Sequence, residues 1–388
     1  MFDYFKNQFL PSKVKREVSE LYISISIKAF AVSMIAVFEP IFLYSIFNSI
    51  QKVILFYILV YLINFFILPL GAKISCKYGF EHAILFSVPA VIVYLFLLFQ
   101  ITNYHFLFYV APIALAIYKS IYWTAHHADF AHYGKSSQRG SEVSVYYSLN
   151  ALVKIVGPLI GGFIIAIFGF EVLFLLVSVI MFCSAIPLFT SKEIFQQSHL
   201  SYWKAIRRFF KPYANYTTRA KLAFMGYGAD FVGMICWPIF IFMVVKDYKV
   251  MGILITLSLL VSCIISLIIG KAIDKKEGDK ILKTSVILSF FTWIFRFFFP
   301  TIAGVFAIDF LDRNINHGLW MPVRTFVYRE GQKRGFMKYI VFSEMGLSFA
   351  KVVMGLFLLI LLLFINSWFI IFFTAGFFTL FFLFLPLK

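Results

Sequence analysis

Long apolar runs separated by short polar stretches extend from about residue 21 to the end of the chain. Most runs hold about 20 residues, which is the length that an α-helix needs to cross the hydrocarbon core of a bilayer. This pattern predicts an all-α polytopic membrane protein of about twelve transmembrane helices. The runs cover approximately residues 21–49, 53–71, 83–101, 104–124, 144–168, 171–190, 222–245, 250–270, 281–299, 302–323, 339–364 and 367–386.

The composition agrees with a membrane protein. Hydrophobic residues make up 62% of the 388 residues and charged residues 14%, whereas a soluble domain is roughly 45–50% apolar and ~25% charged. The first run is too long for a signal-peptide core and lacks a small-residue cleavage site, so we expect it to remain as the first helix. The four cysteines are dispersed, without the spacing of a metal site or redox pair. We therefore expect no metal and no cofactor.

The formal net charge is +17, and most of the Lys and Arg residues that produce it lie in loops. In a soluble protein such a charge would suggest nucleic-acid binding. Here it predicts orientation instead, because loops rich in Lys and Arg stay on the cytoplasmic side. These residues precede the first run and follow the second, fourth, sixth, eighth and tenth runs, while the alternate loops hold few. We therefore expect both termini in the cytoplasm, a multi-pass location in the cytoplasmic (inner) membrane, the lipid bilayer as partner and no nucleic acid.

The two halves of the sequence resemble each other. Trp123 and Trp320 end the fourth and tenth runs, and Lys154 and Lys351 lie at similar depth in the runs that follow. Duplicated bundles that rock about a shared site are typical of transporters. We predict an N-terminal six-helix bundle over residues 1–190, a cytoplasmic linker over 191–220 and a C-terminal six-helix bundle over 221–388.

The linker contains a short amphipathic segment at residues 201–211. Trp203, Ile206 and Phe210 would share one face of a helix there, with Lys and Arg side chains on the other face. A basic amphipathic helix of this kind lies on the inner membrane surface. The alternative is a solvated linker helix.

Two cytoplasmic turns carry related motifs. The turn after the eighth run has the spacing Gly-x-x-x-Asp-Lys, and the turn after the second run has Ser75 in place of the acid. A glycine permits close helix contact, and an aspartate can accept from helix N-terminal amides or pair with a cation across the bundle. We expect the motif residues to control an inner gate, although a chance match in a basic loop is the alternative. They are Gly270, Asp274, Lys275, Gly71 and Lys77.

The fifth run contains Gly157-Pro158 followed by Gly161-Gly162. The glycines would let a neighbouring helix approach closely, and Pro158 removes a backbone hydrogen bond and bends the helix. A plain packing kink would need the same residues.

Together these motifs resemble signatures of the major facilitator superfamily. The Gly-x-x-x-Asp-Lys spacing is similar to its cytoplasmic loop motif, and the Gly-Pro/Gly-Gly segment is similar to the fifth-helix motif of its proton-coupled antiporters. The resemblance implies two six-helix bundles, a central cavity lined by helices 1, 4, 7 and 10, and transport by alternating access. The fifth-helix motif favours export.

Ionisable residues inside the spans provide separate evidence. Each costs at least ~2.5–3.5 kcal/mol at the bilayer centre unless it faces a partner or water, so several of them imply a wet interior. The tenth span should face the cavity with one stripe of polar residues at helical spacing. Asp309 or Asp312 could pair with Arg313, and protonation would break the pair; a static buried pair is the alternative. The polar residues of this span are Asp309, Asp312, Arg313, Asn316, His317 and Trp320.

Asp230 is the lone acid of the seventh span, where it could carry a proton or contact substrate. Alternatively it pairs with Lys351 or Lys154. Lys28, Glu39, Lys119 and Lys351 complete the expected substrate and proton pathway, with Lys119 nearer the inner mouth.

Two further groups lie near the ends of the spans. Glu39 and Arg296 lie toward the outer side and could close an external gate, although snorkelling is the simpler account of Arg296. The run from His126 to His132 contains metal-ligand types, but we favour gate contacts or solvated cap residues there.

These observations predict a proton-coupled secondary transporter of a small organic solute. Export is the favoured direction, and we expect a monomer. The alternative within transporters is an importer of sugars or organic anions, suggested by cationic residues in the spans. From another class, a membrane enzyme or assembly protein on a transporter-like frame would show clustered acids or histidines in a loop facing one side. Only the His126 to His132 run approaches that pattern, so we expect no enzyme. The cationic residues are Lys28, Lys119, Lys154, Arg313 and Lys351.

Overall fold

The computed structural model describes residues 16–133, 140–189, 200–211, 215–272 and 278–387, and within these ranges the secondary structure is helical. Eight helical segments are long and apolar enough to span a membrane. The turn inside α7 divides one of these segments in two, and α11, α13 and α15 are further spans that are shorter or more polar. The described residues therefore form twelve spanning helices, as predicted. The helices are α2 (Arg16–Ile35), α3 (Glu39–Phe47), α4 (Ile50–Tyr78), α5 (Phe80–Gln100), α6 (Leu107–Tyr133), α7 (Gly140–Ala185), η1 (Ile186–Phe189), α8 (Tyr202–Phe210), α9 (Asn215–Phe224), α10 (Tyr227–Val245), α11 (Tyr248–Ala272), α12 (Gly278–Phe298), α13 (Ile302–Arg334), α14 (Phe336–Phe364), α15 (Trp368–Thr379) and η3 (Leu380–Phe384).

Local sequence explains the interruptions in the first half. The first span is broken before Glu39, and Pro40 occupies the first turn of α3, where its missing N–H is not needed. Within α7 the chain reverses at Gly169, whose φ of 85° is readily adopted only by glycine. This turn divides α7 into the predicted fifth and sixth spans.

Several helices extend beyond the apolar runs that predicted them. The second run ends near residue 71, but α4 continues to Tyr78 and ends at Gly79, which has a φ of 92°. The predicted turn over residues 71–79 is therefore wrong. Hydropathy reports where the bilayer ends, whereas a helix ends at a residue that breaks it. The tenth span likewise continues to Arg334.

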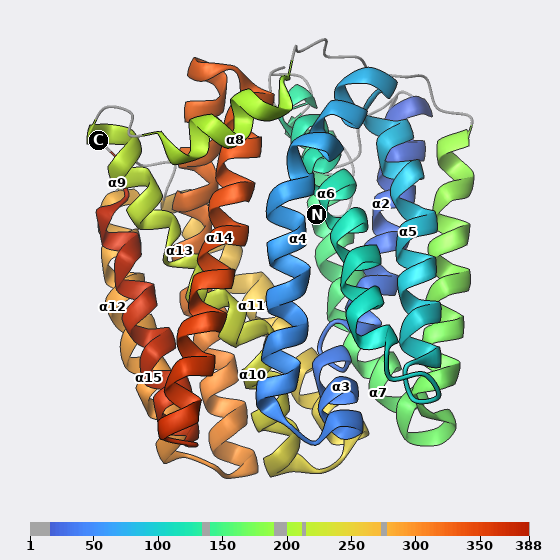
Figure 1. Ribbon diagram of the computed structural model, residues 1–388, viewed down its shortest axis with the longest axis vertical. Coiled ribbons are helices and arrows are strands. Elements are labelled where there is room, and N and C mark those ends of the chain that lie inside the picture. The colour runs from blue at the N-terminus through green and yellow to red at the C-terminus, as the bar shows by residue number, and fades with distance from the viewer. Residues whose placement is uncertain (1–15, 134–139, 190–199, 212–214, 273–277, 388) are drawn as a thin grey trace, which may run out of the picture.

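The two halves of the chain lie side by side (Figure 1), with the first half in blue to green and the second in yellow-green to red. They meet where α4 packs on α14, α7 on α11 and α3 on α10. At the centre of the first contact, Asn64 Nδ2 donates to Ser348 Oγ at 2.8 Å. The bounds 1–190 and 221–388 for the two bundles remain our proposal.

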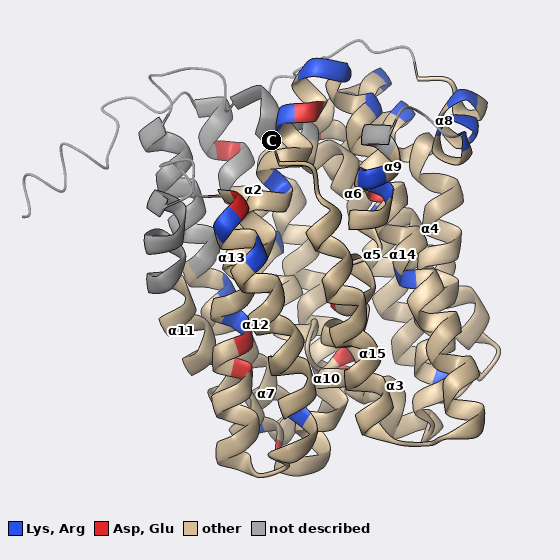
Figure 2. Cartoon of the chain, turned by 90° about the vertical axis from the view of Figure 1, so that its left-hand side faces the viewer, with Lys and Arg blue, Asp and Glu red and all other residues tan. Residues whose placement is uncertain are grey.

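Lys and Arg residues gather at the end of the molecule where α8 lies (Figure 2). The positive-inside rule predicts that this end faces the cytoplasm, and we call it the inner end. Helix α8 is anchored there by Phe209, which is buried with its ring centroid 5.1 Å from Phe65 and 5.5 Å from Phe349. Trp203 and Phe210 are 72% and 60% exposed, so they are free to contact lipid, and the membrane-facing side of this helix stays a prediction.

Candidate functional site

Three cavities of about 290–540 Å³ lie between and beside the halves, among the described residues. The large cavity, about 540 Å³, is lined by α2, α6, α7, α11 and α13. The C-terminal cavity, about 300 Å³, lies among α10 to α13 and α15. The seam cavity, about 290 Å³, lies among α4, α6, α10, α13 and α14. The four helices implied by the resemblance, now α2, α6, α10 and α13, thus all line this system, and further helices join them.

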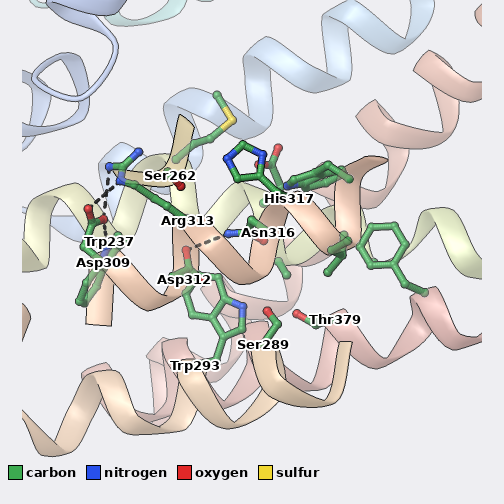
Figure 3. Close-up of a pocket in the computed structure, with 18 of the residues that line it drawn as sticks. Trp237, Ser262, Ser289, Trp293, Asp309, Asp312, Arg313, Asn316, His317 and Thr379 are labelled. Carbon is green, nitrogen blue, oxygen red and sulfur yellow. Dashed lines mark hydrogen bonds and ion pairs between the residues drawn. The ribbon is translucent and has the colours of Figure 1, made fainter. Parts of the chain in front are cut away.

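The polar stripe of α13 lines the C-terminal cavity, and Figure 3 shows its side chains directed toward that space. Arg313 Nε donates to Asp309 Oδ2 at 2.7 Å, so one of the two pairings expected from the sequence is present. Trp237 of α10 donates from Nε1 to Asp309 Oδ1 at 3.0 Å. His317 and Trp320 continue the stripe toward the inner end.

Asp312 pairs with a different cation, Arg296 of α12. The Arg296 Nη2 to Asp312 Oδ2 distance is 2.7 Å, and the Arg296 side chain has 0% exposure. Its guanidinium carbon lies 3.5 Å from the Trp293 ring centroid and 4.4 Å from that of Trp237. The expectation that Arg296 snorkels is therefore wrong, and its role in an external gate stays a prediction. The buried carboxylate of Asp312, which Asn316 also contacts at 2.9 Å, holds it inside instead.

Asp230 forms the other central ion pair. Its Oδ2 atom lies 2.6 Å from Lys351 Nζ of α14, which selects one of the alternatives left open by the sequence. Lys351 also donates to the Tyr61 hydroxyl at 3.2 Å, and Tyr61 comes from α4 in the other half. The Asp230 side chain is 28% exposed and lines both the C-terminal and the seam cavity, whereas Lys351 is buried. The pair thus lies at the boundary between the halves with its acid open to water.

Glu39 and Lys119 belong to the first half. Glu39 accepts from the Tyr57 hydroxyl at 2.6 Å and, with Lys119, lines a small cavity of about 120 Å³ that Met234 of α10 also lines. Lys119 lies halfway along α6, with Nζ 5.3 Å from the centroid of the Tyr61 ring. Its expected place nearer the inner mouth is wrong, because α6 continues well beyond the apolar run.

Histidine contacts join the halves toward the inner end. His127 Nδ1 and the Tyr328 hydroxyl are 2.9 Å apart, and His127 Nε2 lies 3.3 Å from Glu344 Oε1. His127 is therefore no solvated cap residue, and its contacts are those expected of a gate. The side chains of Asp129 and His132 lie outside the described part of the chain.

The structure describes the motif after the second span in full, but only part of the motif after the eighth span. Gly71 lies where a Cβ would meet the backbone carbonyl of Ser120, so it permits close contact of α4 with α6. Lys77 is exposed in the last turn of α4. Gly270 is in α11, but Asp274 and Lys275 fall outside the described residues.

The glycines of the fifth span lie at two tight helix contacts. A Cβ on Gly157 or Gly161 would meet Ser33 or Met34 of α2, and one on Gly162 would meet the backbone carbonyl of Tyr248 in α11. In return, Gly252 of α11 lies against the Pro158 carbonyl. The segment therefore joins α7 to α2 within the first half and to α11 of the second half.

Sequence reasoning missed the aromatic partners of the charged groups, namely Tyr61, Trp237, Trp293 and Tyr328. Trp293 precedes Arg296 by three residues, so helical spacing gave one signal for a stacked guanidinium. For the others, the partner comes from a different helix, and no local pattern marks it.

A helical bundle of two halves with charged groups around internal cavities is the architecture expected of a membrane transporter. The family model described as Major Facilitator Superfamily matches residues 21–323. The chain belongs to this superfamily, and it is a transporter, not an enzyme.

Solved structures of transporters share the fold. The chain is similar to the human organic anion transporter MFSD10 (TETRAN), with 15% identity, a TM-score of 0.68 and coverage of 95% of this chain and 99% of that one. A D-xylose-proton symporter gives 11% identity, a TM-score of 0.70 and coverage of 93% and 95%. A point mutant of the nucleoside transporter NupG gives 12% identity, a TM-score of 0.69 and coverage of 94% and 97%. A search of curated protein sequences finds no significant match.

Proposed function

We propose that this protein is a proton-coupled secondary transporter that moves a small organic solute across the cytoplasmic membrane by alternating access, as a monomer and in the outward direction. The observation that carries the proposal is the ion pair of Asp230 with Lys351 beside Tyr61, at 2.6 and 3.2 Å. It joins a cavity-facing acid to a buried base at the boundary between the two halves.

A proton on Asp230 would change the energy of this arrangement. Protonation removes the negative charge that offsets Lys351, and a buried cation without a counter-charge is strongly unfavourable. The conformation that lets Lys351 reach water or another anion then gains population, because a ligand shifts an equilibrium by its differential affinity for the two states. Tyr61 connects the event to the other half, since its hydroxyl accepts the hydrogen bond from Lys351.

The pairs in the C-terminal cavity have a supporting role in this proposal. Asp309 with Arg313, and Asp312 with Arg296, keep two carboxylates beside the C-terminal cavity. Asn316, His317 and Trp320 extend that lining toward the seam, where Trp320 also lines the seam cavity. Solute and protons would share this region.

The direction of transport is proposed from the fifth span. Its glycines let α7 pack closely against α2 and α11, and a segment of this kind resembles the motif of proton-coupled exporters. Import of a sugar or organic anion is the alternative. Flux measured in inside-out and right-side-out membrane vesicles under the same imposed pH gradient decides between the two.

The test of coupling uses Asp230→Asn with Asp279→Asn as its matched control. Asp279 is an exposed acid at the start of α12, where it pairs with Lys283 at 2.7 Å. In proteoliposomes with an internal pH dye, the Asp230 variant should fold and bind solute but show no solute-driven proton movement. The control should retain it. Normal proton movement in the Asp230 variant would remove that residue from the coupling mechanism.

A further inference from the structure

The large cavity is lined by more cations than the carboxylates of the described residues neutralise. Its charged lining residues in the described part of the chain are Lys28, Lys154, Arg313 and Arg324, and no Asp or Glu is among the residues that line it. Arg313 is offset by Asp309. The other three cations have no carboxylate within ion-pair distance among the described residues.

Lys28 is the deepest of these cations. It is 1% exposed, and its Nζ atom donates to the Ser87 hydroxyl at 3.2 Å and the Ile84 carbonyl at 3.4 Å. The same atom lies 4.6 Å from the Tyr122 ring centroid. These contacts solvate the ammonium group in part but do not neutralise it, and a buried charge of this kind is retained only with a strong compensating partner.

Two exposed cations at the entrance add further positive charge to the large cavity. Lys154 of α7 and Arg324 of α13 are both exposed, one from each half, and both line the cavity. Cations around an opening with low-dielectric walls raise the local concentration of anions. A ligand that spans from the entrance to Lys28 would therefore meet positive charge at two depths.

The walls of the large cavity add aromatic side chains and one polar atom that has no hydrogen-bond partner among the described residues. Tyr118, Tyr122 and His126 stack in sequence along α6, with ring centroids 5.4 Å apart and interplanar angles of 15° and 12°. Trp123 and Tyr328 line the same space. The buried His126 Nδ1 atom has no hydrogen-bond partner among the described residues, so it can contact a polar group of a ligand.

From these contacts we infer that the large cavity binds an organic anion with at least two negative charges and an aromatic or apolar body. One acidic group pairs with Lys28, and the second lies between Lys154 and Arg324. The aromatic faces of α6 hold the body, and about 540 Å³ accommodates a molecule of metabolite or drug size. This inference rests on the proposed transport function, for which it names the solute class.

The experiment measures binding alone, so it does not depend on flux. Full-length protein with Cys183→Ser and Cys263→Ser is unfolded by heat in maltoside detergent with a thiol-reactive dye, which then reports exposure of the buried Cys76 and Cys236. Phthalate, phenyl phosphate, benzoate and benzamide are compared at constant ionic strength. Ligands that bind only the folded state raise the Tm. Phthalate and phenyl phosphate should raise it, with a Kd at least ~10-fold lower than that of benzoate, and benzamide should have no effect.

Variants test the residues. Lys28→Met removes the buried charge at similar length, so it should raise the Tm without ligand while weakening phthalate binding by at least ~10-fold. Arg324→Gln should weaken binding similarly. Lys338→Gln is the matched control, since Lys338 is exposed on α14 and lines none of the three cavities; its binding should not change.

Three results would overturn the inference: equal shifts with benzamide and phthalate, equal affinity for benzoate and phthalate, or unchanged phthalate binding in both Lys28→Met and Arg324→Gln. Its failure is separable from failure of the proposed function. Dianion binding combined with proton coupling that survives Asp230→Asn would contradict only the coupling mechanism. Coupled flux of a neutral solute without dianion binding would contradict only the solute class.

Discussion

The pair of Asp312 with Arg296 allows a quantitative test of the buried charges. Asp312→Asn would leave the Arg296 guanidinium without a counter-charge at a position with 0% side-chain exposure. Removing one partner of a buried ion pair destabilises a protein by ~3–5 kcal/mol, because the other charge stays buried. The Asn carbonyl can still accept a hydrogen bond, and the contacts of the guanidinium with Trp293 and Trp237 remain. We therefore expect the lower end of that range.

A loss of about 3 kcal/mol corresponds to roughly a 150-fold change in the unfolding equilibrium constant. Equilibrium unfolding with SDS in mixed micelles, followed by circular dichroism, measures it. The double variant Arg296→Met with Asp312→Asn should recover stability to within ~1 kcal/mol of the parent protein, because no charge is then left unpaired.

Asp309→Asn is the internal comparison. Its partner Arg313 has 25% side-chain exposure and lines two cavities, so water can solvate the freed cation. We expect a loss of only ~1 kcal/mol, as for partly exposed pairs. Equal losses for the Asp309 and Asp312 variants, or a double variant no more stable than Asp312→Asn alone, would refute the argument that burial of Arg296 sets the cost.

Three further predictions concern the contact of α7 with α11, the contacts of His127 near the inner end, and the topology. Gly162→Val would place a side chain against the backbone of α11, so we expect a loss of ~1–3 kcal/mol in stability, measured by unfolding in SDS; unchanged stability would contradict the close contact. His127→Ala removes the contact with Glu344, so a thiol reagent added from the inner side should label Cys263 in the large cavity faster, while stability changes by only ~1 kcal/mol. Equal labelling rates in the variant and the parent protein would show that the contact does not restrict entry. Cysteines replacing Lys338 and Lys52 should label from the cytoplasm and the exterior respectively, and the opposite result would invert the topology.

Membrane insertion and helix number could be predicted from the sequence because bilayer thickness fixes the length of an apolar span. Helix ends were less predictable. In α4 the helix passes through the residues where the apolar run stops and ends at Gly79. A bilayer constrains side-chain polarity, whereas a helix end depends on backbone conformation.

The candidate site also contains one part that the sequence predicted and another that it did not. Asp309 and Arg313 are four residues apart on one helix, so helical geometry alone brought them together, and the structure gives the pair at 2.7 Å. The partners of Arg296 and Asp230 come from other helices. For Arg296 the simplest account from sequence, an interfacial position, was wrong.

The sequence by itself determined that the chain spans a membrane, how many times it does so, which loops carry positive charge and which spans contain costly ionisable groups. Each of these follows from the transfer energy of residues taken in order along the chain. Only the tertiary structure decided which charges are neutralised: Lys351 is paired, whereas Lys28 is buried without a carboxylate partner among the described residues. That difference depends on distances between separate helices, and such distances are fixed by packing, which no local pattern contains.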